Sequence, residues 1–155
     1  MTDSAHPQPA APSAGLSDAG RPVAFRWPVR VYFEDTDVGG VVYHAGYLRF
    51  FERCRTEWLR SRGLDQQTLL DRHAIAFAVR SMAVDWLAPA RLDDLLEVGF
   101  EVREARRASM KGVQRIVRAD DGALLCSASV RVACVRVPDF RPVAIPDSLL
   151  ESLTA

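Results

Sequence analysis

The chain has 155 residues, the usual length of one domain, so two domains would be unexpected. Its 20 Lys and Arg balance its 20 Asp and Glu, which excludes a net field that would attract nucleic acid, an anionic membrane or an acidic polymer. The balanced totals do not exclude a basic patch on one part of the surface. Cys54, Cys126 and Cys134 occupy apolar-patterned positions without CxxC spacing, which predicts reduced core thiols and a cytoplasmic location.

Residues 1–22 are rich in Ala, Pro, Ser and Gly, and they contain no basic segment leading into the apolar stretch of a signal peptide. We expect a disordered tail there, followed by one domain over 23–155. No apolar run reaches the roughly 18 residues of a transmembrane helix, so no membrane insertion is expected.

The domain is expected to open with a strand and a long helix. Arg26 to Glu34 alternate between apolar and polar residues, which indicates a half-buried strand with Phe33 on its apolar face. From Tyr47 a helical period begins, and Gly63 after two arginines is the expected helix end. The predicted buried face of this helix consists of Tyr47, Phe50, Phe51, Cys54 and Trp58.

The rest of the chain predicts a short helix and four more strands. The parity of the strand from His73 to Trp86 changes midway, which indicates a bulge near Arg80 and Ser81. The elements that follow the long helix are a helix at Gln66–Asp71 capped by Asp65, strands at His73–Trp86, Leu96–Val102, Ser109–Arg118 and Leu124–Cys134, a hairpin turn at Asp120–Gly122, and a short helix from Asp147.

Short connections between the last four strands predict antiparallel pairing. One apolar helix and one apolar-faced sheet pack together most simply when the sheet curves around the helix. The sequence therefore predicts an α+β domain in which a curved antiparallel five-stranded sheet wraps one long central helix. Its open sheet edges favour pairing of two copies across a two-fold axis.

An acid-rich turn, Asp35 to Gly40, stands immediately before the long helix. Its two glycines permit positive φ and let another group approach the backbone. A carboxylate beside a helix N-terminus can serve acid–base or nucleophilic chemistry, but a DxD turn by itself is more often a hydrogen-bonded cap. Asp35, Asp37 and His44 match no compact metal-binding loop, so no metal is expected.

Three stretches resemble a known family: EDTDVGGVVYHAGYLRFFERCRTEWL, AFAVRSMAVDWLAPARLDDLLEV and SMKGVQRIVRADDGALL. They are similar to hotdog-fold acyl-CoA thioesterases of the 4-hydroxybenzoyl-CoA thioesterase family, and within it to the YbgC-like, Tol-Pal-associated branch. The similarity extends from about Val29 to Leu149. It implies the hotdog fold, hydrolysis of acyl-CoA to a free acid and CoA, and no bound cofactor. It also implies a homodimer or homotetramer with sites at the subunit interface.

The resemblance also implies roles for single residues. Asp37, the second acid of the turn, is expected to be the catalytic nucleophile or general base. The backbone N–H of His44 is expected to polarise the thioester carbonyl, and its imidazole to position the substrate or donate a proton. Gly40, Val41 and Tyr43 are expected to contact the substrate.

Coenzyme A also needs cations for its phosphates. The expected supply is the basic segment Arg106, Arg107, Lys111 and Arg115, of which Arg107 and Lys111 are the main candidates; the alternative is an ordinary solvated turn. Two other functions stay open: an aromatic acyl-CoA thioesterase, and a non-catalytic acyl-thioester binding protein on the same fold. GxSxG, P-loop and Rossmann motifs are absent from the sequence.

Overall fold

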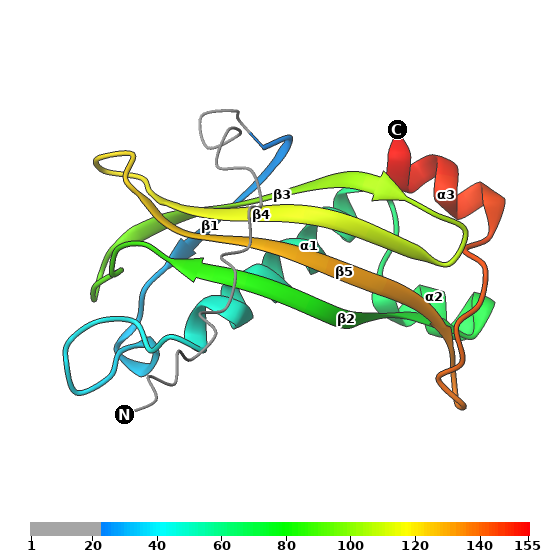
Figure 1. Ribbon diagram of the computed structural model, residues 1–155, viewed down its shortest axis with the longest axis horizontal. Coiled ribbons are helices and arrows are strands. Elements are labelled where there is room, and N and C mark those ends of the chain that lie inside the picture. The colour runs from blue at the N-terminus through cyan, green and yellow to red at the C-terminus, as the bar shows by residue number, and fades with distance from the viewer. Residues whose placement is uncertain (1–22) are drawn as a thin grey trace, which may run out of the picture.

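The structure, a computed structural model, describes residues 23–155, so the tail expected over 1–22 lies outside the described residues. The described part contains five strands, three α-helices and one 3₁₀ turn (Figure 1). These elements are β1 (Phe25–Arg30), the 3₁₀ turn η2 (Phe33–Asp35), α1 (Gly46–Ser61), α2 (Gln66–His73), β2 (Ile75–Trp86), β3 (Leu95–Ala105), β4 (Ser109–Arg118), β5 (Leu124–Arg136) and α3 (Asp147–Thr154).

The strands form one antiparallel sheet in the order β1-β3-β4-β5-β2, and α1 lies across one face of it (Figure 1). This confirms the α+β hotdog architecture with one long helix against a five-stranded sheet. No helix in the described range 23–155 is long and apolar enough to cross a bilayer.

The predicted apolar face of α1 is confirmed. Tyr47, Phe50, Phe51, Cys54 and Trp58 are all buried, and they pack against the inner side chains of the sheet. The three cysteines are free and buried, as expected, and burial raises the pKa of both Cys54 and Cys126 to about 12. The core thiols are therefore unreactive at neutral pH.

Several predicted boundaries were wrong, and the last strand, β5, ends at Arg136 instead of Cys134. The first strand ends at Arg30, four residues earlier than Glu34, because the chain turns into η2 after Val31 and leaves Phe33 82% exposed. His73 belongs to α2, since Ala74 adopts the left-handed conformation (φ 51°) and ends that helix before β2 begins. The third strand, β3, extends to Leu95 and Ala105, beyond the range that alternation had indicated.

The sequence of β4 alternates poorly between apolar and polar residues, and the structure shows why. Its residues alternate strictly between the two faces, but a glycine and a glutamine occupy inward positions. An added Cβ on Gly112 would lie 2.4 Å from the Phe100 ring, so only glycine fits beneath that ring. Gln114 is fully buried and donates to the Phe51 carbonyl of α1 at 3.1 Å. Both positions are inward-facing although neither is hydrophobic.

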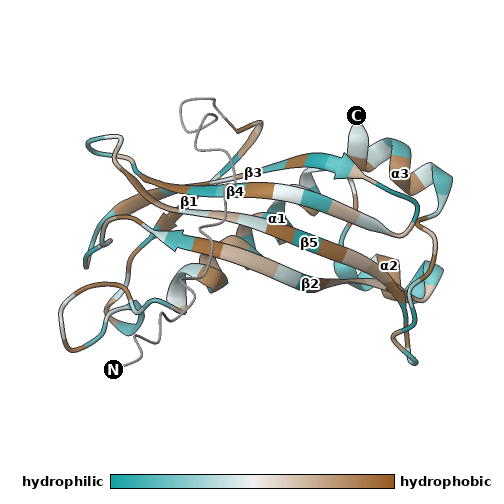
Figure 2. Cartoon of the chain, in the orientation of Figure 1, coloured by the Kyte–Doolittle hydropathy of each residue, from teal (hydrophilic) through white to brown (hydrophobic). Residues whose placement is uncertain are grey.

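β2 forms one edge of the sheet and pairs with β5 alone in the described part of the chain. The predicted bulge is confirmed, because the register shifts between Val79 and Ser81 and skips Arg80. Val79 and Trp86 are 48% and 47% exposed. Hydrophobic segments recur along both β2 and β5 in Figure 2, so this edge combines unpaired backbone with apolar surface.

Candidate functional site

The turn before α1 is built by hydrogen bonds within its own residues. The Asp37 N–H donates to the Val41 carbonyl at 2.9 Å, and the Gly39 N–H donates to Asp37 Oδ1 at 2.8 Å. Gly40 has φ +74°, the conformation for which the glycine was expected. These bonds fix the direction of the Asp37 side chain, which is exposed.

The first acid of the turn, Asp35, has a structural role. Asp35 Oδ2 accepts from the Tyr32 N–H at 2.8 Å and so caps η2, while its carbonyl accepts from the Tyr43 N–H at 3.1 Å. Asp35 is therefore committed to the local backbone. Asp37 is the acid of the pair whose carboxylate faces outward with only one backbone contact.

A second loop anchors the turn from outside. The Val42 N–H donates to the Ala90 carbonyl at 2.9 Å, and Val41 forms a β-bridge with Arg91. The Ala90 N–H in turn donates to the Tyr47 hydroxyl of α1 at 3.0 Å. Residues 87–94, the loop between β2 and β3, thus tie the turn to the first turn of the helix.

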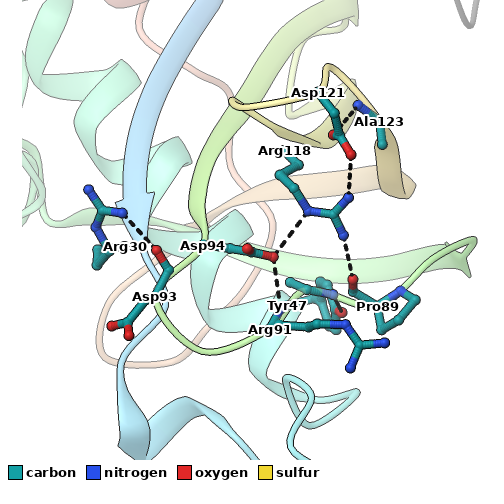
Figure 3. A network of polar contacts seen from close by, with 10 residues as sticks. Arg30, Tyr47, Pro89, Arg91, Asp93, Asp94, Arg118, Asp121 and Ala123 are labelled. Atoms are coloured by element: carbon teal, nitrogen blue, oxygen red, sulfur yellow. Dashed lines mark hydrogen bonds and ion pairs between the residues drawn. The ribbon is translucent and has the colours of Figure 1, made fainter.

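Arg118, at the end of β4, fixes that loop (Figure 3). Its guanidinium donates to the Pro89 carbonyl at 2.9 Å, to Asp94 at 3.1 Å and to Asp121 at 2.8 Å. Asp94 also accepts from the Arg91 N–H at 2.9 Å. The ion pairs raise the pKa of Arg118 through its hydrogen bonds to Asp121 and then Asp94. This arginine therefore ties two points of the loop, Pro89 and Asp94, to the turn between β4 and β5 at Asp121.

The entry into α1 leaves donors available. The N-cap residue, Ala45, supplies no side-chain cap. Within residues 23–155 the His44 N–H donates no hydrogen bond. An uncapped helix N-terminus with a free N–H favours negative charge. The expected oxyanion donor therefore lies in a suitable electrostatic position.

Trp86 fixes the position of His44. Its indole Nε1 donates to the His44 carbonyl at 3.0 Å, and the two rings lie edge to face with centroids 5.9 Å apart. The Tyr43 ring contacts the other side of the imidazole, with centroids 4.4 Å apart. Trp86 is the last residue of β2, so the edge strand directly supports the turn.

The structure brings together only part of the predicted site. Asp37, Gly40, Val41, Tyr43 and His44 share the turn. Of the basic segment, Arg106 and Arg107 lie in the turn between β3 and β4, at the opposite end of the sheet (Figure 1). Lys111 and Arg115 belong to β4 itself, Lys111 near its start.

Within the basic segment, Arg106 and Lys111 both contact Glu104, the lysine at 3.0 Å. Arg107 is exposed, and its carbonyl accepts from the Ile145 N–H at 2.8 Å. In one chain, therefore, these cations do not approach Asp37.

Two concave regions lie away from the turn. A groove of about 420 Å³ on the outer face of the sheet contains three cations among small residues: Arg103, Lys111 and Arg131. A smaller cavity of about 140 Å³ lies between α1 and the inner face of the sheet. Its lining includes Phe77, Val79, Phe100, Met110 and Val132, with polar residues of α1 at its rim.

Sequence reasoning missed the residues that position the turn. Trp86 resembled an ordinary strand residue, and Arg118 and Asp94 resembled surface charges, because their partners are distant in the sequence. Arg55 fell on neither face of the predicted helix, yet it lines the smaller cavity. The sequence held one signal of a structured loop, a closely spaced set of proline and charged residues after β2: Pro89, Arg91, Asp93 and Asp94.

The comparisons with known proteins agree with this geometry. The model of the thioesterase-like superfamily matches residues 31–153. The acyl-CoA thioesterase YbgC of Haemophilus influenzae is 52% identical over 122 residues, which are 79% of this chain and 88% of that protein.

Two solved structures extend the likeness to the fold. A probable thioesterase from Bartonella henselae is 35% identical, with a TM-score of 0.75 over 79% of this chain and 100% of its own. A 1,4-dihydroxy-2-naphthoyl-CoA thioesterase from Synechocystis is 26% identical, with a TM-score of 0.77 over 83% and 94% of the two chains. The chain therefore belongs to the thioesterase-like superfamily and, within it, to the YbgC acyl-CoA thioesterases.

Proposed function

We propose that this protein hydrolyses acyl-CoA to a free carboxylic acid and coenzyme A, with Asp37 as the reacting carboxylate. The observation that carries the proposal is an outward-facing Asp37 on the turn that leads into α1, whose N-terminus has no side-chain cap, in a chain 52% identical to an acyl-CoA thioesterase. No metal or bound cofactor is needed, because carboxylate and backbone N–H together supply the chemistry.

Two routes fit this arrangement. As nucleophile, Asp37 attacks the thioester carbon, the thiolate of CoA leaves, and water cleaves the resulting anhydride. As general base, it removes a proton from water as the water attacks. In both routes charge develops on the carbonyl oxygen, and the His44 N–H would stabilise it. A preorganised donor of this kind contributes roughly 3 to 4 kcal/mol.

The active unit in this proposal is a homodimer joined through β2. This strand is twice as long as the other edge strand, β1, with 12 residues against 6, and β1 contains Pro28. Two copies of β2 related by a two-fold axis pair antiparallel, which covers the exposed Val79 and Trp86. A tetramer of two such dimers is compatible with this contact.

In the proposed dimer, the two-fold axis also brings together the Asp37 turn and the basic segment, which are far apart in one chain. Antiparallel pairing sets the Trp86 end of one β2 beside the Ile75 end of the other. Trp86 holds His44, so the turn of one copy approaches the end of its partner where the basic segment lies. The site would then combine Asp37 and His44 of one subunit with the basic end of the other.

Coenzyme A phosphates would bind at that basic end. The outer groove, with Lys111, Arg103 and Arg131, is proposed as their contact surface, together with the exposed Arg107. Reduced buried thiols fit a cytoplasmic enzyme. Association with the Tol-Pal system stays a prediction from the family branch.

An aromatic acyl group is the second candidate substrate. The Synechocystis relative is a 1,4-dihydroxy-2-naphthoyl-CoA thioesterase, and a cavity of about 140 Å³ is close to the roughly 150 Å³ that accommodates benzene. A panel of short, long and aromatic acyl-CoAs, with release of free CoA followed by chromatography, separates the two classes. Binding without turnover of any member would instead support a non-catalytic binding protein.

Replacing the reacting carboxylate tests the chemistry. We expect Asp37→Asn to lower kcat/KM at least about a hundredfold, which corresponds to roughly 2.7 kcal/mol of transition-state stabilisation. Asp35→Asn is the matched control, because an amide oxygen can still accept from Tyr32; its turnover should change little. Undiminished hydrolysis by Asp37→Asn would contradict the assignment.

Trp86→Phe tests how far the edge strand positions the turn. The ring stays but the hydrogen bond to the His44 carbonyl is lost, and such a bond is worth about 0.5 to 1.5 kcal/mol. We expect kcat to fall about three- to tenfold while the melting temperature changes little. Trp27→Phe on β1 is the control for loss of an indole. Equal kcat values for the native protein and Trp86→Phe would show that His44 needs no such support.

Lys111→Met tests the proposed phosphate contact. We expect KM for acyl-CoA to rise several-fold, whereas turnover of the matching acyl-pantetheine, which lacks the nucleotide phosphates, should be unaffected. Arg72→Met, an exposed arginine of α2, is the control. Equal effects of Lys111→Met on both substrates would place the phosphates elsewhere.

A further inference from the structure

Arg55 is a cation in an apolar environment. It projects from the middle of α1 and lines the cavity of about 140 Å³ together with Phe77, Phe100 and Met110. No carboxylate in the described range 23–155 forms an ion pair with it. Burial lowers the pKa of the Arg55 guanidinium, and the negative charge of Glu52 partly offsets this decrease. A half-buried cation without a paired anion is costly unless it has a further partner.

Gln114 holds this cation in place. Arg55 Nη1 donates to Gln114 Oε1 at 2.7 Å, and Gln114 Nε2 donates to the Phe51 carbonyl at 3.1 Å. Gln114 is the one fully buried polar side chain among the described residues. The buried Gln114 amide therefore joins β4 to α1. Its oxygen accepts from Arg55 and so fixes one end of the guanidinium. The remaining guanidinium N–H groups stay available to a ligand.

The acidic residue at the cavity, Glu52, acts on Arg55 through its charge but hydrogen-bonds within its own helix. Glu52 Oε1 accepts from the Thr56 hydroxyl at 2.9 Å, and Thr56 accepts from Gln66 Nε2 at 3.0 Å. These three polar side chains line the cavity together with Arg55, and its other lining residues are apolar. The arrangement suits a compact apolar chain that ends in a hydrogen-bond acceptor.

In the proposed dimer the cavity would serve the turn of the second copy. Arg55 lies nine residues beyond Gly46, so it is about 13 Å along the axis of α1 from its own turn. A cavity of benzene size cannot bridge that span. Phe77 and Val79 place the cavity at the Ile75 end of β2, the end that antiparallel edge pairing brings beside Trp86 and His44 of the second copy.

We propose that this cavity receives the acyl group and that Arg55 binds its far end, which makes Arg55 a specificity residue for short acyl groups that end in a carboxylate. The inference rests on the proposed thioesterase function and on the proposed dimer. A carboxylate gives the guanidinium the ion pair that the described part of the chain does not supply.

Two substrates of equal size test the proposal. Beyond its thioester carbonyl, glutaryl-CoA has as many heavy atoms as benzene, and 5-methylhexanoyl-CoA has the same skeleton with methyls in place of the carboxylate oxygens. The measured quantity is the ratio of kcat/KM for glutaryl-CoA to that for 5-methylhexanoyl-CoA. Free CoA is followed by chromatography, with an enzyme-free blank for spontaneous glutaryl-CoA breakdown.

We expect the native protein to prefer glutaryl-CoA and Arg55→Met to lower the ratio about tenfold or more, because hydrogen bonds to charged groups are the strong ones. Arg55→Lys should retain part of the preference. Arg53→Met, an exposed arginine on the same helix, should keep the native ratio. Gel filtration and circular dichroism check that each variant keeps its fold.

A native preference for 5-methylhexanoyl-CoA would overturn the proposal without any variant. So would an unchanged ratio in Arg55→Met. Turnover of neither substrate, nor of any other acyl-CoA, by the native protein would reject the proposed function itself, and the role of Arg55 with it.

Discussion

The hydrogen bond from the Val42 N–H to the Ala90 carbonyl, 2.9 Å long, joins the Asp37 turn to the loop after β2. Arg118 then fixes this loop through the Pro89 carbonyl and Asp94 (Figure 3). The turn has few contacts with the core of its own, because most of its side chains are exposed. Its position relative to α1 therefore depends on an ion-pair network at the end of β4, far away in the sequence.

That dependence explains a division within the chain. The sheet and α1 form the buried, rigid part, whereas the proposed reacting groups lie on a turn that the rigid part holds at two points. A turn of this kind can lie at the surface and keep its geometry, because the bonds that support it come from strand ends. The Tyr47 hydroxyl serves both parts, being buried in the core and bonded to Ala90.

The sequence predicted the fold in detail where local physics decides it. The apolar face of α1, the Asp65 cap and the bulge at Arg80 all follow from periodicity or short-range hydrogen bonding, and all are confirmed. The end of β1 was missed, since the apolar Phe33 continues the alternation although the chain has already left the sheet. Gly112 and Gln114 weakened the pattern of β4 because each suits one particular neighbour, a ring and a helix carbonyl.

The candidate site was predictable only in part, for a related reason. A contiguous motif identified the turn, and the structure keeps Asp37 and His44 in it. The supports, Trp86 and Arg118, come from distant strand ends and had no local signature. Arg55 was assigned to neither helix face, since its role depends on a buried glutamine of another strand. In the proposed dimer these groups act together across a two-fold axis, for which the sequence holds no local signal.

The central claim is that each site is shared, with the Asp37 turn of one subunit serving the cavity of the other. Subunit complementation between Asp37→Ala and Thr56→Trp, which would fill the rim of the cavity, tests it most directly. Each variant alone should be inactive toward short acyl-CoA. Randomly mixed dimers should recover about a quarter of native activity, because half are hybrids with one intact site. No recovery, with hybrid dimers shown to form, would mean that turn and cavity act within one chain and would contradict the account.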